Sequence, residues 1–170
     1  MFDAAAPGRV PVPEDPRDLP GEFRFRRPIE VRFADTDAMG HVNNANYLTY
    51  CEIARADYYE RVTGQPLSLG AHGASEGMIL AEARVAFRAA AFYGETLTIE
   101  ARVSRVGRTS FTQEYRLTAP ESRYGSARLV ATSESVQVMY DYAREVPVPV
   151  SHELVAALEA FEGRSLRDAG

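Results

Sequence analysis

The sequence is short of several residue types, and each shortage narrows what the protein can do. It holds one cysteine, Cys51, so no disulfide can form within the chain. Because it has only three histidines and no second cysteine, it offers no cluster with metal-ligand spacing, and we expect no metal and no cofactor. It has no lysine, so every basic side chain is an arginine, whose planar guanidinium suits two-point contacts with phosphate. A general bias in the composition of the genome would equally explain why lysine is absent.

Long apolar runs and basic clusters are also missing. No segment approaches the roughly 20 apolar residues that cross a bilayer, so we expect no membrane span. Asp3 and Arg9 interrupt the first stretch, which therefore does not resemble a secretory signal. The net charge of -5 and a pI near 5.3 offer no basic surface for nucleic acid. These absences predict a cytoplasmic protein with neither a nucleic-acid nor a membrane partner.

The remaining composition is that of an ordinary globular domain. Hydrophobic residues make up 45% of the 170 residues and charged residues 25%, which is enough for one domain with a sizeable core. Residues 1–21 carry five prolines and little that could be buried, so we predict an extended N-terminal tail. We place the folded domain at residues 22–163 and a C-terminal tail at residues 164–170.

Hydrophobic spacing predicts a first strand and then one long helix. Apolar residues alternate with charged residues from Phe23 to Phe33, which indicates a strand interrupted at Pro28. A helix is expected to start near Asn43, whose short side chain can cap free N–H groups, and to end at Gly64. Its apolar positions repeat at helical spacing: Tyr47, Cys51, Ala54, Tyr58 and Val62.

The second half of the chain is typical of an antiparallel sheet. Residues 68–77 are rich in glycine and serine and predict a loop. Period-two alternation then predicts four strands between Met78 and Tyr142, joined mostly by short glycine turns. A short helix should follow from Ser151 to Phe161. This order indicates an α+β fold in which one long helix covers one face of the sheet.

The polar segment that leads from the first strand into the helix is where we expect chemistry. Backbone N–H groups at a helix start lack acceptors and carry partial positive charge, so they can stabilise an oxygen that becomes negative. Asp37 can supply the base, and Gly40 would let the loop turn so that this carboxylate faces the same N–H groups. The same residues also fit a structural role, in which Asp35 and Asp37 cap turns and Asn43 and Asn44 cap the helix.

The motif resembles the start of a known family. Residues 31–44 read Val-Arg-Phe-Ala-Asp-Thr-Asp-Ala-Met-Gly-His-Val-Asn-Asn, and Tyr47 and Glu52 follow. This pattern is similar to the opening motif of the 4-hydroxybenzoyl-CoA thioesterase-like branch of the hotdog superfamily, and the resemblance covers nearly all the chain beyond the tail. It implies a hotdog fold, with a five-stranded antiparallel sheet wrapped around one long helix; the short C-terminal helix would follow.

The resemblance also implies the roles of individual residues. Asp37 would be the catalytic carboxylate, and the backbone N–H of Asn44 would polarise the thioester carbonyl. Our candidate substrate-binding residues are His41, Val42, Asn43, Tyr47, Arg88 and Arg108. The two arginines are chosen for the chemistry of their guanidinium groups, which suits phosphate, and not because the resemblance implies them. The family's pocket lies between two subunits, so we expect a homodimer or homotetramer that binds an acyl-CoA.

We therefore predict an acyl-CoA thioesterase that releases a free acid and CoA. Asp37 would either activate water or attack the carbonyl itself. Two alternatives stay open. A hotdog hydratase or dehydratase acting on enoyl- or hydroxyacyl-thioesters would use His41 as its acid or base, together with a second acid that the sequence does not offer. A non-catalytic hotdog module would bind acyl-CoA without turnover and use the proline-rich tail as a tether.

Overall fold

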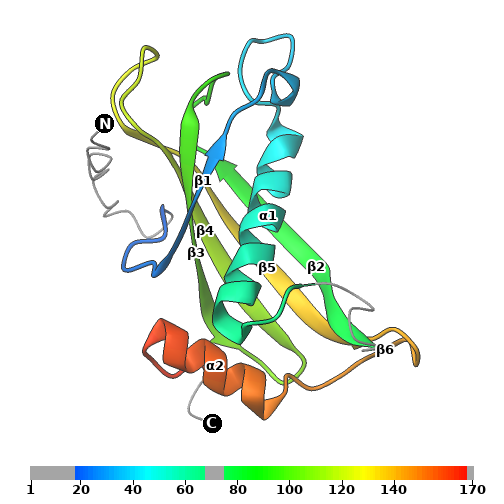
Figure 1. The fold of residues 1–170 in the computed structure, drawn as a ribbon. Helices are drawn as coiled ribbons and strands as arrows, with labels where there is room; N and C mark the ends of the chain where they lie inside the picture. The colour runs from blue at the N-terminus through cyan, green and yellow to red at the C-terminus, as the bar shows by residue number, and fades with distance from the viewer. Residues whose placement is uncertain (1–17, 68–74, 168–170) are drawn as a thin grey trace.

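A long helix crosses one face of a curved antiparallel sheet (Figure 1). The computed structural model describes residues 18–67 and 75–167. In chain order the elements are β1 (Phe25–Glu30), a short 3-10 helix (Phe33–Asp35), α1 (Asn44–Thr63), β2 (Glu76–Phe87), β3 (Thr96–Val106), β4 (Ser110–Ala119), β5 (Arg128–Asp141), β6 (Val146–Pro147) and α2 (His152–Glu162).

The sheet has the strand order β1-β3-β4-β5-β2, and every neighbouring pair is antiparallel. The two-residue strand β6 pairs with the end of β5 and adds a sixth strand to the five expected. The predicted α+β hotdog architecture, with one long helix and a short C-terminal helix, is confirmed. Strands β1 and β2 form the two ends of this order.

Strand β1 differs from the sequence-based expectation in two respects. It runs without interruption through Pro28, which pairs with Thr98 of β3. A proline is tolerated here because β1 lies at an edge, where a missing N–H can face away from the neighbouring strand. Phe33, expected on the apolar face of this strand, instead lies in the 3-10 helix and is 76% exposed.

Helix α1 begins and ends where the sequence predicts. The Asn43 side chain accepts a hydrogen bond from the Ala45 N–H at 2.9 Å, and Gly64 ends the helix with a left-handed φ of 71°. Its buried side chains lie against the sheet: Tyr47, Tyr50, Cys51, Ala54, Arg55 and Tyr58. Each buried large apolar side chain stabilises the fold by about 1.5–3 kcal/mol, so tertiary packing holds this helix in place.

Strand β2 starts earlier than expected and is poorly covered. Glu76 and Gly77, predicted as loop, belong to the strand, whereas residues 68–74 of that predicted loop lie outside the described residues. The strand pairs with β5 along one side, and Leu80 and Phe87 are 47% and 51% exposed. A long edge strand with exposed apolar side chains is a surface on which another strand can pair.

The described N-terminal residues pack on the face of the sheet opposite α1. The Phe23 ring is 4% exposed and packs against the guanidinium groups of Arg102 and Arg116, which lie 4.3 and 4.2 Å from its centre. The carbonyls of Pro20 and Leu19, inside the predicted tail, accept hydrogen bonds from Arg102 at 3.0 Å and Arg116 at 3.3 Å. Residues 19–23 therefore form a strap across β3 and β4.

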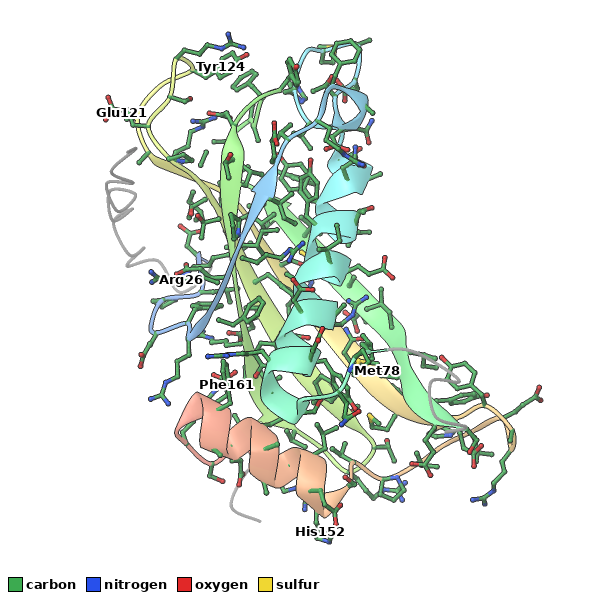
Figure 2. All side chains as sticks on the ribbon, in the orientation of Figure 1. Arg26, Met78, Glu121, Tyr124, His152 and Phe161 are labelled. Carbon is green, nitrogen blue, oxygen red and sulfur yellow. The ribbon has the colours of Figure 1, made fainter. Side chains whose placement is uncertain are left out.

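The C-terminal part closes the far end of the helix layer. The Ser151 side chain caps α2 by accepting from the Leu154 N–H. Phe161 of α2, which Figure 2 labels, packs edge-on against Tyr58 of α1, with ring centres 5.4 Å apart. Leu166, inside the predicted C-terminal tail, is 3% exposed, and its carbonyl accepts from the Val106 N–H at 2.8 Å.

Candidate active site

The loop before α1 is a tight turn. Thr36 and Val42 face each other across an isolated antiparallel bridge. Within it, the Asp37 N–H donates to the His41 carbonyl at 3.1 Å, and the Asp37 carbonyl accepts from the Gly40 N–H at 2.9 Å. Gly40 has a φ of 81°, a conformation that strains other residues. The glycine that the sequence suggested as a turning point is therefore required by the backbone.

The Asp37 carboxylate lies at the N-terminal end of α1. One of its oxygens accepts from the Met39 N–H at 2.9 Å, and the other lies 3.4 Å from the amide nitrogen of Asn43. The same Asn43 side chain caps α1 through Ala45. A single asparagine thus links the half-buried carboxylate to the start of the helix.

The first turn of α1 supplies the complementary donor. The N–H of Asn44 has no acceptor within its own helix, because helical hydrogen bonds begin only after the first turn. The aligned peptide dipoles add partial positive charge at the same place. Asn44 is exposed and directly follows Asn43, whose side-chain nitrogen lies 3.4 Å from the Asp37 carboxylate.

Asp35 has a different role from Asp37, although it lies only two residues earlier. Its side chain is 1% exposed and accepts from the Arg32 guanidinium at 2.7 Å, the Arg32 N–H at 2.9 Å and the Tyr50 hydroxyl at 2.9 Å. The hydrogen bond from Arg32 is the main reason that the pKa of Asp35 lies below its usual value. Asp35 is an anchor of the loop.

The backbone of Asp35 completes this anchor. Its carbonyl accepts from the Asn43 N–H at 2.9 Å and from the Asn46 side chain at 2.8 Å. Sequence reasoning missed Asn46 and Tyr50 as supports of the loop. Their separation of four residues puts them on one side of a helix, which is the signal that could have indicated a shared partner.

A second loop, residues 88–95, packs against the site loop. The Ala91 carbonyl accepts from the Val42 N–H at 2.8 Å. The Tyr47 side chain is 3% exposed, and its ring packs edge-on against Phe87, with centres 5.1 Å apart. Burial raises the pKa of Tyr47, and a hydrogen bond with the Ala91 backbone opposes this effect. Tyr47 and Val42 therefore join α1 and the site loop to the second loop.

An ion pair holds the second loop in place. The Glu95 carboxylate accepts from Arg128 at 2.7 Å, the Ser122 hydroxyl at 2.6 Å and the Phe92 N–H at 2.9 Å. Arg128 also donates to the Ala90 carbonyl at 2.9 Å. Burial by itself would raise the pKa of Glu95, but these hydrogen bonds outweigh it and lower the pKa. The sequence did not identify Glu95 or Arg128, because the two are far apart in the chain.

His41 is placed beside the site without an acidic partner. Its Nδ1 lies 3.3 Å from the Val42 carbonyl oxygen. Among the described residues, the hydrogen bonds and ion pairs link His41 to no carboxylate.

The two predicted phosphate contacts lie at different ends of the chain's fold. Arg88 follows β2 at the start of the second loop, and its guanidinium pairs with Asp18 at 2.6 Å. Arg108 lies in the turn after β3, where its carbonyl accepts from the Val150 N–H. Glu95 and the site loop adjoin the opposite end of β3, a strand of 11 residues that spans about 35 Å. Arg108 therefore lies away from the site loop of its own chain, and the Arg88 guanidinium is held by Asp18 of the N-terminal segment.

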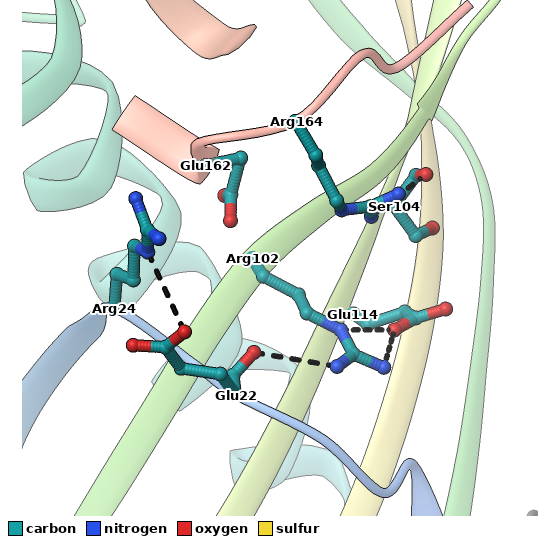
Figure 3. Close-up of a pocket in the computed structure, with 7 residues that line it drawn as sticks. All are labelled: Glu22, Arg24, Arg102, Ser104, Glu114, Glu162 and Arg164. Atoms are coloured by element: carbon teal, nitrogen blue, oxygen red, sulfur yellow. Dashed lines mark hydrogen bonds and ion pairs between the residues drawn. The ribbon is translucent and has the colours of Figure 1, made fainter. Parts of the chain in front are cut away.

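A polar pocket of about 450 Å³ lies away from the predicted site residues (Figure 3). It is lined by Glu22, Arg24, Arg102, Ser104, Glu114, Glu162 and Arg164. Arg102 pairs with Glu114 at 2.6 Å, and Arg24 with Glu22 at 3.7 Å. Because positive and negative side chains alternate and pair here, the pocket is a structural junction between the strap, the sheet and α2.

The fold and the site define a hotdog protein with a carboxylate at the start of its central helix, and similarity gives its family. The Thioesterase-like superfamily matches residues 31–158, and the chain belongs to this superfamily. The predicted resemblance is confirmed.

Three known proteins are similar to the chain. A thioesterase from Thermus thermophilus, solved with coenzyme A and zinc, is 30% identical with a TM-score of 0.71, over 85% of this chain and 98% of that chain. A 1,4-dihydroxy-2-naphthoyl-CoA hydrolase from Synechococcus elongatus is 27% identical over 64% of this chain and 79% of its own. The uncharacterised protein YsmA of Bacillus subtilis is 28% identical over 55% of this chain, which spans 60% of its length.

The described residues hold neither a metal-binding cluster nor a helix that could span a membrane. Residues 18–67 and 75–167 contain no group of three or more histidine, cysteine, aspartate or glutamate side chains that could hold a metal ion. In the same part of the chain, neither helix is long and apolar enough to cross a membrane.

Proposed function

We propose that this protein is an acyl-CoA thioesterase, which hydrolyses an acyl-CoA thioester to a free acid and coenzyme A. The observation that carries the proposal is the Asp37 carboxylate held by Asn43 at the N-terminus of α1. Membership of the thioesterase-like superfamily and the similarity to a thioesterase solved with coenzyme A support it. A helix N-terminus facing a carboxylate is the minimum apparatus for acyl transfer.

The proposed reaction uses the two groups at once. The thioester oxygen accepts from the Asn44 N–H, so the charge that develops on this oxygen is stabilised by the helix start. Asp37 takes a proton from water as the water oxygen attacks the carbonyl carbon, or its own oxygen attacks and water then hydrolyses the anhydride. The carbon–sulfur bond breaks and a proton passes to the CoA sulfur. Water is the only co-reactant, so no cofactor is needed.

The assembly that we propose is a homodimer, or a homotetramer built from two dimers. The exposed edge of β2, with Leu80 at 47% exposure, offers free backbone groups that a second copy can pair. We also propose that the protein is located in the cytoplasm, which the composition of the sequence favours. Light scattering at micromolar concentration should give a dimer or tetramer, and a fully active monomer would contradict this assembly.

The test of the activity is a panel of aromatic, short and long acyl-CoAs, with free thiol and enoyl product both followed. Asp37→Asn should lower kcat by about 10²- to 10⁴-fold, because the amide cannot accept a proton or attack a carbonyl. Melting temperature and gel-filtration volume should stay close to those of the wild type. The amount of free thiol released must increase with the amount of acyl-CoA added.

Two neighbouring variants serve as controls for Asp37. Asp35→Asn should act mainly through stability, and His41→Ala should retain most turnover per folded molecule. The assignment fails if Asp37→Asn stays within about threefold of the wild-type kcat while either control abolishes turnover. Enoyl product without thiol, formed from a 3-hydroxyacyl-CoA added to the panel, would indicate a dehydratase, and acyl-CoA binding without any turnover would indicate a binding module.

A further inference from the structure

The layer between α1 and the sheet contains a polar cluster within an otherwise apolar core. Six side chains form this cluster: Cys51 and Arg55 from α1, Gln113 and Tyr115 from β4, and Ser133 and Ser135 from β5. Each is at most 9% exposed. Strand pairing sets Gln113 opposite Ser135 and Tyr115 opposite Ser133, so these four side chains share one face of the sheet.

Part of the cluster has no hydrogen-bond partner. Within the described part of the chain, neither the nitrogen nor the oxygen of the Gln113 amide is paired, and the Ser133 hydroxyl has no partner other than the neighbouring Cys51 thiol. Gln113 is 1% exposed, so bulk water does not replace the missing partners. By contrast, Ser135 accepts from Gln137 at 2.9 Å and lies 3.4 Å from the Tyr115 hydroxyl. Buried polar groups are nearly always paired, so these orphaned atoms indicate an occupant.

The Arg55 guanidinium indicates that the occupant is negatively charged. The Arg55 side chain is 10% exposed and interacts with the neutral Tyr115 hydroxyl, and its ion-pair partner among the described residues is Glu52, at 4.0 Å, whose side chain is 72% exposed. An under-compensated buried charge is costlier than an unpaired amide or hydroxyl. The cluster therefore presents a guanidinium, an amide N–H₂ and a hydroxyl as donors around a site that suits an anionic oxygen.

The cluster lies on the same helix face as the proposed site. Tyr47, Cys51 and Arg55 follow one another at four-residue spacing, and all three are buried. Arg55 lies 11 residues beyond Asn44, about 16 Å along the helix axis, and helical side chains lean back toward the N-terminus. An acyl group whose carbonyl binds at Asn44 can follow this stripe toward the cluster.

We propose that the cluster is the far end of the acyl pocket and binds a terminal carboxylate of the substrate. The preferred substrates are then CoA thioesters of medium-chain dicarboxylic acids, with the second carboxylate free. Arg55, Gln113 and Ser133 donate hydrogen bonds to that carboxylate. This inference rests on the proposed thioesterase function and adds the class of acyl group.

The first test uses the wild-type protein and substrates matched in length. Hexanoyl-, octanoyl- and decanoyl-CoA are compared with hexanedioyl-, octanedioyl- and decanedioyl-CoA, and 8-hydroxyoctanoyl-CoA tests a neutral oxygen. The dicarboxylic substrate should have the higher kcat/KM by about tenfold or more at one length at least. The inference is overturned if the alkyl or hydroxyl substrate is equally good, even though thioesterase activity then stands. No hydrolysis of any acyl-CoA overturns the proposed function itself.

The second test uses Arg55→Met, with Arg61→Met as its matched control. Arg61 lies exposed in the last turn of the same helix. Arg55→Met should raise KM for the preferred dicarboxylic substrate about tenfold and leave octanoyl-CoA within about threefold, and Arg61→Met should change neither. A proportional loss on both substrates would overturn the inference. If Arg55→Met does not fold, product inhibition of the wild type by octanedioate, but not by octanoate, tests the same contact.

The third test uses the orphaned amide. Gln113→Leu removes two unpaired buried atoms, so the melting temperature of the ligand-free protein should stay the same or rise, while the preference for the dicarboxylic substrate falls. A Gln113 amide that only stabilised the fold would behave differently. A drop of several degrees with the preference intact would show that Gln113 is satisfied within the fold, and this would overturn its assignment to the pocket.

Discussion

The Tyr50 hydroxyl donates a hydrogen bond of 2.9 Å to the Asp35 carboxylate, which ties the site loop to the buried face of α1. Asp35 is 1% exposed, whereas Asp37 is half-buried and contacts the first residues of the helix through Asn43. Two aspartates separated by one residue therefore have different tasks. Asp35 fixes the loop, and Asp37 is left to meet a substrate.

Asp35→Asn should lower the free energy of unfolding at neutral pH by roughly 1.5–3 kcal/mol, because hydrogen bonds to a charged group are lost. Its effect should also depend on pH. The pKa of Asp35 is lowered in the folded state, so its stabilisation is complete above the unfolded value near 3.9 and is lost as pH falls through the folded value. Urea unfolding at pH 7, 5 and 3.5 should show the gap between wild type and variant shrinking only below about pH 4. A gap independent of pH would contradict the charged role of Asp35.

Asn43 joins two functions that two substitutions can separate. Asn43→Ser keeps an oxygen that can cap α1 but is too short to reach Asp37, whereas Asn43→Ala loses both contacts. Both variants should lower kcat, and only Asn43→Ala should also lower stability, by about 1 kcal/mol. Thermal melts beside steady-state kinetics measure the two effects. Unchanged kcat in Asn43→Ser would show that the contact with Asp37 does not matter for turnover.

The Glu95–Arg128 pair should be worth more to the fold than a surface ion pair. Glu95 has a side-chain exposure of 1% and Arg128 of 18%, so Arg128→Met leaves a buried carboxylate without its cation. We expect a loss of about 3–5 kcal/mol, and the double variant Arg128→Met/Glu95→Gln should recover part of it. Chemical denaturation measures both. A double variant no more stable than Arg128→Met would contradict this account.

The same pair should affect turnover through the second loop. Arg128 holds the Ala90 carbonyl, and the neighbouring Ala91 carbonyl holds the site loop through Val42. In the folded fraction of Arg128→Met, KM should rise and kcat should fall together. Steady-state kinetics of Arg128→Met, measured well below its melting temperature, would show both changes. If KM and kcat equal those of the wild type, the Glu95–Arg128 pair only stabilises the fold.

The strap across β3 and β4 should contribute to stability through Phe23. Phe23→Ala should lower the free energy of unfolding by about 3 kcal/mol, because the ring is buried and packs against Arg102 and Arg116. For a chain of this length that corresponds to roughly 6–12 °C in melting temperature. Deletion of residues 1–17 serves as the control and should leave the melting temperature nearly unchanged. A large loss on that deletion would contradict the predicted domain start at residue 22.

The sequence by itself determined the central helix and the candidate site. A short cap at Asn43, apolar residues at helical spacing and a glycine at position 64 specify α1 through contacts within one segment. Asp37, Gly40 and Asn44 also lie within one loop and the helix start that follows it. The relation of Asp37 to Gly40 is local, so their spacing alone predicted the turn that leads into α1.

Only the tertiary structure decided the contacts between distant segments. Pro28 could stay in β1 because that strand is at an edge, and its neighbours are unknown until the sheet forms. Arg88 meets Asp18, whereas Arg108 is carried to the other end of β3. The Gln113 amide looks like any strand residue in the sequence, and its missing partners appear only when α1 covers it. Side-chain pairing across long sequence separations depends on strand order and register, which no local pattern encodes.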